Sequence, residues 1–207
     1  AVRAMVVVHA PRVALAILRG RAQRARSSGD EGWGFFKPHV YSARAGVFFD
    51  IDGMGHMNNA AYLVHCELAR WELTAATGML EYAMKERAAF IVAMTAIRYK
   101  REIKPLQRFE IHTQLIASDD KWMTLAHEFR APDTGDPLAV ALCRAVLKQH
   151  GGTCSPRALL RAVGLDLDLC PKPRAELKAA LQSCEALDAA LRDAARSQPA
   201  APRPADR

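Results

Sequence analysis

The chain has 207 residues and a formal net charge of +7, a length that suits one domain with extensions. Residues 1–28 hold six arginines and no acidic residue; subtracting these six charges leaves +1 for the rest, which argues against nucleic acid as a partner. The five cysteines are odd in number and form no C-x-x-C pair, which argues against a disulfide framework or a zinc site and favours a reducing compartment.

Residues 1–36 are predicted to form a basic N-terminal extension. The first 28 are arginine-rich, acid-free and intermittently apolar, which is typical of a mitochondrial transit peptide. A retained extension that lies on an anionic membrane or on a partner subunit is the alternative. Its apolar runs are shorter than the roughly 20 residues that a membrane span needs. We therefore expect a mitochondrial location, with a cytoplasmic or membrane-associated one as the alternatives, and peripheral membrane contact through residues 1–28.

The middle of the chain predicts one long helix followed by antiparallel strands. A strand is expected over residues 40–49, and a helix over 59–77 whose apolar residues cover nearly its whole circumference, which predicts burial. Gly78 stands where a left-handed C-terminal residue is expected, before a short helix over 80–87. Four further strands are expected at 89–101, 109–118, 122–130 and 137–149. This order predicts an α+β fold in which a curved antiparallel sheet wraps around the long helix.

The C-terminal part differs from the middle. Residues 155–165 predict a short helix, and residues 174–197 carry apolar side chains at three- and four-residue steps, which indicates an amphipathic helix. Beyond Ser197 the tail has nothing to bury and is expected to be disordered. The predicted domains are the extension over 1–36, a central domain over 37–165, and the C-terminal helix and tail over 166–207.

The most specific stretch is "FFDIDGMGHMNNAAYLVHCELARWE", residues 48–72. Its aspartate, glycine turn, His-Met-Asn-Asn and Tyr-Leu, followed by Glu and Ala-Arg-Trp on a helix, resemble the hotdog-fold acyl-CoA thioesterases of the 4-hydroxybenzoyl-CoA thioesterase-like superfamily. The later "AIRYKREIKPLQRFEIHTQLIASDDKWMTLAHEF" is similar to the paired central strands of that family. The His-Met-Asn-Asn variant is most similar to a branch with an apolar N-terminal extension. The resemblance covers about residues 40–165.

This resemblance implies a hotdog fold, an antiparallel sheet wrapped around a long central helix, here with helical N- and C-terminal extensions. It also implies a homodimer with active sites at its interface and an acyl-CoA or acyl-carrier substrate, with no cofactor beyond the coenzyme A of the substrate and no metal. Asp52 matches the family's catalytic carboxylate, and Gly55 the turn that points N–H groups at the thioester carbonyl. His56 and Asn58 match side chains that are catalytic in some members and brace the loop in others. Glu67 matches the helix carboxylate near the pocket.

Elementary chemistry agrees with these roles. The N-terminus of a helix carries unsatisfied N–H donors and about half a positive charge, which stabilise a carbonyl oxygen as it becomes an oxyanion. A leaving thiol has a pKa of about 8.5, so its departure needs no strong general acid. What remains is a carboxylate that activates water or attacks the carbonyl, and Asp52 can do either.

Each of these residues also has a structural interpretation. Aspartate and asparagine at a helix start are commonly N-caps, which applies to Asp52, Asn58 and above all Asn59. His56 can brace the tight turn, and Asp50 is expected to be a turn residue.

Two alternatives concern the helix and the later strands. Glu67 lies three residues before Arg70, so a structural ion pair competes with a role in the reaction. Basic residues after residue 97 are placed to meet coenzyme A phosphates, although charges at strand ends are commonly solvated. The residues expected to contact the substrate are Asn59, Tyr62, Arg98 and Lys100.

Two functions from different classes follow. The first is a thioester hydrolase that uses Asp52. The second is a catalytically inactive acyl-binding or structural subunit of a larger complex, such as a mitochondrial membrane assembly, held there by its terminal extensions.

Overall fold

The computed structural model describes residues 2–26, 37–165 and 175–197. The chain divides into two compact units, residues 1–172 and 173–207, which we describe separately. The described part of the first unit contains the sheet and the helices α1 (Val2–Arg26), α2 (Asn59–Thr77), α3 (Met79–Lys85) and α4 (Pro156–Ala162). The second contains α5 (Ala175–Ser197), as the apolar periodicity predicted. The expected disorder beyond Ser197 concerns residues outside these ranges.

The sheet is antiparallel, as predicted. Its strands have the order β1-β3-β4-β5-β2, and β6 pairs with β5. In β3, side chains of one face are buried while those of the other are more exposed, which is the alternation of a half-buried strand. The strands predicted at 122–130 and 137–149 begin and end where they were expected. The bounds are β1 (His39–Arg44), β2 (Ala89–Tyr99), β3 (Arg108–Ser118), β4 (Trp122–Arg130), β5 (Pro137–Gln149) and β6 (Gly152–Cys154).

The strand predicted over 40–49 ends early, at Arg44. Asp50 Oδ2 accepts a hydrogen bond from the backbone N–H of Gly46 at 2.8 Å, and the N–H of Asp50 donates to the carbonyl of Gly46 at 3.0 Å. These two bonds close a turn over residues 46–50. The apolar residues inside it, Val47, Phe48 and Phe49, are exposed, and a propensity for strands was outweighed by the local hydrogen bonds of one aspartate.

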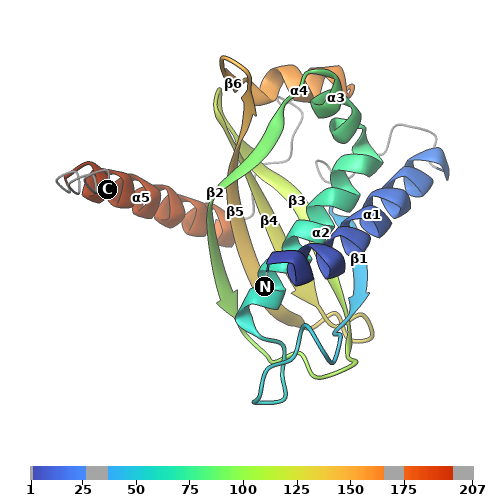
Figure 1. Cartoon of the computed structure of the whole chain (residues 1–207). Helices are drawn as coiled ribbons and strands as arrows, with labels where there is room; N and C mark the ends of the chain where they lie inside the picture. The colour runs from blue at the N-terminus through green and yellow to red at the C-terminus, as the bar shows by residue number, and fades with distance from the viewer. Residues whose placement is uncertain (1, 27–36, 166–174, 198–207) are drawn as a thin grey trace, which may run out of the picture. The chain divides into compact units, whose positions relative to one another are not determined.

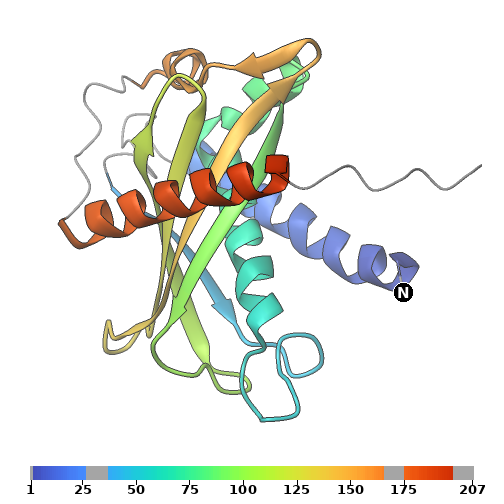
Figure 2. The same ribbon diagram turned by 90° about the vertical axis from the view of Figure 1, so that its left-hand side faces the viewer.

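Helix α2 lies along the sheet and forms the centre of the fold, as predicted (Figure 1). Figure 2 shows strands β2 to β5 running side by side along the length of this helix. Tyr62 packs against Phe129 of β4 with ring centroids 5.1 Å apart, and Leu68 is 1% exposed. The helix begins after the N-cap residue Asn58 and ends at Gly78, whose φ of 83° is the expected left-handed conformation.

Helix α1 packs along α2, which the sequence did not predict (Figure 1). The two backbones are close at Gly20, where an added Cβ would lie 2.2 Å from the carbonyl oxygen of Glu72. Ala16, on the same helix, is 2% exposed. Pro11 lies inside the helix without ending it. None of the described helices combines the length and the apolar character that a membrane-spanning segment requires.

Candidate active site

The loop between β1 and α2 carries the polar motif, and hydrogen bonds hold it at both ends. The N–H of Asn58 donates to the carbonyl of Asp50 at 2.8 Å, and the N–H of Met57 donates to the carbonyl of Ile103 at 2.8 Å. Gly55 has a φ of 82°, which a residue with a Cβ rarely adopts, so this tight turn requires glycine. The loop is therefore a defined structure at the mouth of α2.

Asp52 and His56 are brought together in this loop. The side chain of Asp52 is 33% exposed, and its Oδ1 accepts a hydrogen bond from the N–H of Met54 at 2.9 Å. Its Oδ2 lies 3.4 Å from Nδ1 of His56. One carboxylate oxygen thus supports the local turn, and the other faces the imidazole and solvent.

Asn58 acts as the helix cap, and Asn59 is an exposed residue of the first turn. Asn58 Oδ1 accepts a hydrogen bond from the N–H of Ala61 at 2.8 Å, and its Nδ2 donates to the carbonyl of Phe49 at 3.4 Å. The capping role that the sequence assigned mainly to Asn59 therefore belongs to Asn58. Both polar atoms of its amide have structural partners.

Asp50 holds the loop to the helices, a role beyond that of a turn residue. Its side chain is 4% exposed, and Oδ2 lies 3.0 Å from Nε2 of His65 on α2. Oδ1 accepts a hydrogen bond from Arg12 of α1 at 3.3 Å. Burial by itself would raise the pKa of Asp50, but the hydrogen bonds from His65 and Gly46 and the charge of Arg12 outweigh it and hold that pKa below its ordinary value. One signal in the sequence was His65, a polar residue between the apolar Val64 and Cys66 of α2.

A second cation of α1 meets a second buried carboxylate. Arg19 Nε lies 3.2 Å from Oε2 of Glu72, whose side chain is 4% exposed, and His39 Nε2 lies 3.4 Å from Oε1. The Arg19 guanidinium also lies over the ring of Tyr41. The face of α2 toward α1 thus carries two polar side chains, His65, which contacts Asp50, and Glu72, which contacts Arg19.

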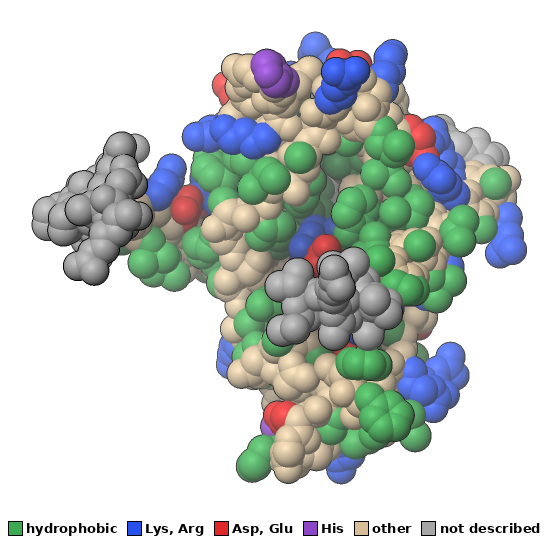
Figure 3. All heavy atoms as spheres, in the orientation of Figure 1, with side chains coloured by type: hydrophobic (Ala, Val, Ile, Leu, Met, Phe, Trp, Pro, Cys, Tyr) green, Lys and Arg blue, Asp and Glu red, His purple; other side chains and the backbone are tan. Residues whose placement is uncertain are grey.

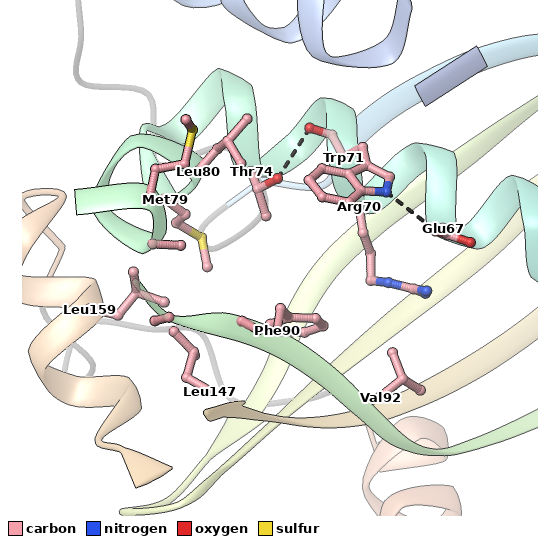
Figure 4. A pocket seen from close by; sticks show the side chains of 14 residues that line it. Glu67, Arg70, Trp71, Thr74, Met79, Leu80, Phe90, Val92, Leu147 and Leu159 are labelled. Carbon is pink, nitrogen blue, oxygen red and sulfur yellow. Dashed lines mark hydrogen bonds between the residues drawn. The ribbon is translucent and has the colours of Figure 1, made fainter. Parts of the chain in front are cut away.

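An apolar pocket of about 410 Å³ lies beside the C-terminal half of α2. Figure 3 shows it as a hollow between hydrophobic side chains, with acidic and basic atoms at one end. The apolar wall comes from α3, α4 and the strands, and α2 contributes Glu67, Arg70, Trp71 and Thr74 (Figure 4). The volume lies in the range of about 300–1,000 Å³ that is usual for small-molecule sites.

Of the predicted site residues, only Glu67 lines this pocket. Its Oε1 accepts a hydrogen bond from Nε1 of Trp71 at 3.2 Å, and its Oε2 lies 3.3 Å from Nε2 of His9. Glu67 makes these two contacts in place of the predicted ion pair with Arg70. Arg70 instead lies 3.4 Å from Nε2 of His127, a residue of β4 for which the sequence predicted no role.

The remaining predicted residues lie elsewhere. Asp52 does not line the pocket of its own chain. Tyr62 is 3% exposed, in contact with Tyr99 and Phe129, and burial raises its pKa to about 12. Arg98 and Lys100 are exposed at the end of β2. Within the described residues, no group of three or more histidine, cysteine or acidic side chains is arranged to hold a metal ion.

Comparison with other proteins identifies relatives of the chain. Protein THEM6 of Danio rerio is 36% identical over 98 residues, which are 47% of this chain and 48% of that protein. Protein THEM6 of Drosophila melanogaster is 32% identical over 137 residues, 66% of this chain and 68% of that protein. The chain thus spans about half to two thirds of the length of these relatives.

Solved structures share the fold. YbaW, a probable thioesterase from Escherichia coli, matches with a TM-score of 0.55 and 23% identity over 60% of this chain and 94% of that one. BH1999, a gentisyl-coenzyme A thioesterase, matches with a TM-score of 0.52 and 19% identity over 60% of this chain and 98% of that one. These matches confirm the hotdog fold that was predicted from the motif and the order of helix and strands.

The family profile described as the thioesterase-like superfamily matches residues 47–183. This range includes the loop, α2 and the whole sheet except β1. Because the match spans more than half of the chain, the chain belongs to the thioesterase-like superfamily.

Proposed function

We propose that the chain hydrolyses an acyl-CoA or acyl-carrier thioester as a homodimer, with Asp52 as the general base or the nucleophile. The observation that carries the proposal is the position of Asp52. Its partly exposed carboxylate stands just before the N-terminus of α2, the central helix of a chain in the thioesterase-like superfamily. In this position a carboxylate and the N–H groups of a helix can act on the same carbonyl group.

The chemistry needs few groups. The first turn of α2 stabilises negative charge on the carbonyl oxygen as the carbon is attacked. Water adds to that carbon while Asp52 takes its proton, and the C–S bond breaks to give a carboxylic acid and a thiol. His56, with Nδ1 3.4 Å from Asp52 Oδ2, can hold the carboxylate in position.

The separation of Asp52 from the pocket of its own chain is explained by a dimer through β2. This strand is the last in the described sheet order, and Ile91 and Val92 on it are 47% and 39% exposed. A long edge strand with exposed apolar side chains is a surface for pairing with another strand. Two copies of β2 would pair antiparallel about a twofold axis.

Such a dimer would bring the two regions together. The end of β2 lies near the start of α2, because Tyr99 and Tyr62 are in contact with ring centroids 5.0 Å apart. The pocket lies at the other end, where Phe90 and Met79 line it. In an antiparallel pair the end of one β2 strand lies beside the start of the other. Asp52 of the partner subunit would therefore approach the pocket of the first.

The direct test is release of free thiol by the purified protein from a panel of acyl-CoAs of increasing chain length. The Asp52→Asn variant should lower kcat/KM by about 100-fold or more, since a positioned base contributes about 10²–10⁴. Asp133→Asn, an exposed aspartate in the turn between β4 and β5, is the matched control and should keep full activity. Equal turnover by Asp52→Asn and the parent would remove Asp52 from the mechanism.

Mixed dimers test whether the site is shared. Ala83 lines the pocket, so Ala83→Trp should fill it and abolish turnover without changing Asp52. Mixing this variant with Asp52→Asn should restore about a quarter of the parent activity, because about half of the dimers are mixed and each has one intact site. Absence of recovery, with subunit exchange verified, would show that Asp52 of one subunit does not act on the pocket of the other.

An inactive acyl-binding or structural subunit is the second candidate function. The position of Asp52 outside the pocket of its own chain favours it. A protein of this kind would bind acyl-CoA without releasing thiol and would co-purify with a larger assembly. Thiol release that is lost in Asp52→Asn contradicts this alternative.

A further inference from the structure

Arg70 is a cation in the wall of the pocket, and among the described residues no acidic side chain forms an ion pair with it. It lies on α2, half-buried, and its side chain extends from the helix toward the strands (Figure 4). Its Nη1 lies 3.4 Å from Nε2 of His127. In the described parts of the chain no carboxylate lies within ion-pair distance of its guanidinium.

His127 accepts from Arg70 but does not cancel its charge. Burial, and in addition the positive charge of Arg70, hold the pKa of His127 well below its ordinary value, so the ring is neutral. A guanidinium only donates hydrogen bonds, so Nε2 of His127 is the acceptor and the ring proton is on Nδ1. That nitrogen lies 2.9 Å from Oγ1 of Thr113 and donates to it. The sheet thereby orients the Arg70 side chain, and within the described residues its other guanidinium donors are left for a ligand.

Glu67 is one turn away on the same helix, but its carboxylate is engaged elsewhere. It accepts from Trp71 at 3.2 Å and faces His9 at 3.3 Å, and its side chain is 43% exposed. Figure 4 shows it extending along α2 while Arg70 points into the space between the helix and the strands. Glu67 therefore stands at the open side of the pocket and Arg70 on its inner side.

The rest of the wall limits which anion fits. Met79, Leu80, Phe90, Leu147 and Leu159 surround the space with apolar atoms. A phosphate group would lose its hydration against such a wall, which is costly for a charge that has only one partner. A carboxylate on an apolar chain satisfies both parts, because the chain contacts the apolar wall and the head group forms charge-assisted hydrogen bonds with the guanidinium.

We propose that this pocket binds a carboxylic acid with an apolar chain and that Arg70 binds its carboxylate. The source of this ligand rests on the proposed function, because thioester hydrolysis releases an acid of this class. The binding itself is independent of turnover, so it is measured without a thioester. Arg70 would contact the carbonyl end of the acyl chain before cleavage and the carboxylate after it.

The experiment compares decanoate with decanol, which share one chain length and differ in the charged head group, by calorimetric titration of the full chain at neutral pH. The parent should bind decanoate about tenfold more tightly, the effect of a hydrogen bond to a charged group. Arg70→Gln should reduce this preference to about one, and Arg70→Lys should retain part of it. Arg161→Gln, an exposed arginine on α4, is the matched control and should leave the preference unchanged.

Equal affinity of the parent for the acid and the alcohol overturns the proposal, whether or not the variants fold. A preference that persists in Arg70→Gln also overturns it, because the carboxylate then has another partner. If the parent protein prefers the acid but releases no thiol from acyl-CoAs, the proposed hydrolysis is contradicted and the Arg70 site remains supported. Thiol release by a parent protein that shows no preference for the acid would support the proposed hydrolysis and overturn the Arg70 site.

Discussion

The two faces of α2 are built on different principles. Toward the sheet the helix presents an apolar surface, with Tyr62 against Phe129. Toward α1 it presents His65 and Glu72, and these polar side chains meet Asp50, Arg12 and Arg19 at distances of 3.0 to 3.2 Å. The first face is stabilised by burial of apolar area, which requires only the right residue class at the right period. The second is stabilised by specific pairs, each of which fails if one partner is removed.

This difference teaches that α1 is part of the folded domain. Its arginines supply the cations for two carboxylates that are otherwise almost fully buried. One of these, Asp50, also closes the turn that leads into the Asp52 loop. The helix that the sequence predicted as a presequence or an anchor therefore contacts the residue that holds the loop of the candidate active site.

The largest expected effect comes from deleting residues 1–28. Asp50 and Glu72 would lose Arg12 and Arg19, and each broken buried pair costs about 3–5 kcal/mol, less where a partner is partly exposed. We expect the free energy of unfolding to fall by at least about 4 kcal/mol, measured by urea denaturation. A shortened chain as stable as the parent would show that α1 is not part of the domain.

The next effect is that of Asp50→Asn. Loss of the carboxylate leaves Arg12 without its partner and should cost about 3 kcal/mol at neutral pH. Because the pKa of Asp50 is lowered in the folded state, its contribution is present above the ordinary aspartate pKa and is lost as the pH falls through the lowered value.

The pH dependence provides a second measurement on the same variant. The parent should lose this part of its stability on acidification, whereas Asp50→Asn should show a flatter acid limb. Denaturation series at neutral and acidic pH compare the two. If both chains lost the same amount of stability in acid, the carboxylate of Asp50 would not carry the pairing.

Gly20→Ala gives a smaller effect whose sign is diagnostic. In a helix with free surroundings, alanine for glycine stabilises by about 1 kcal/mol. Here the new Cβ would lie 2.2 Å from the Glu72 carbonyl oxygen, so we expect destabilisation by about 2 kcal/mol. Ala14→Gly, on the exposed side of α1, is the control and should cost only the helix propensity. A stabilised Gly20→Ala would mean that α1 and α2 are not in close contact.

The smallest effect is expected on the outer side of α1. Leu18 is 61% exposed, so Leu18→Ala should change the free energy of unfolding by less than about 0.5 kcal/mol. Thermal melts of this variant beside Gly20→Ala separate the two sides of the helix. A large loss for Leu18→Ala would indicate that another surface covers this side in solution.

The elements of the central domain were largely predictable because their signals are local. The all-round apolar pattern of residues 59–77 predicted a buried helix, and Gly78 predicted its end. The strands of residues 122–130 and 137–149 were recognisable from composition and from the turns between them. The proximity of Asp52 and His56 also followed from the sequence, since they are four positions apart in a tight loop.

Two contacts that the sequence did not predict join distant parts of the chain. Arg12 and Asp50 are 38 residues apart, and Arg70 and His127 are 57 residues apart. Nothing in the spacing of these residues indicates that they meet. The strand prediction for residues 40–49 was too long because the side chain of Asp50 completes a turn that composition alone did not indicate.

The motif, the central helix and the succession of strands along the chain were predictable from the sequence, because periodicity and turn residues act over a few positions. Only the tertiary structure decided that α1 supplies Arg12 and Arg19 to buried carboxylates, that Asp52 stands apart from the pocket, and that Arg70 lies in its wall. The physical reason is that an ion pair or a pocket wall depends on distances across the fold. Such distances are set when the helices and the sheet pack together.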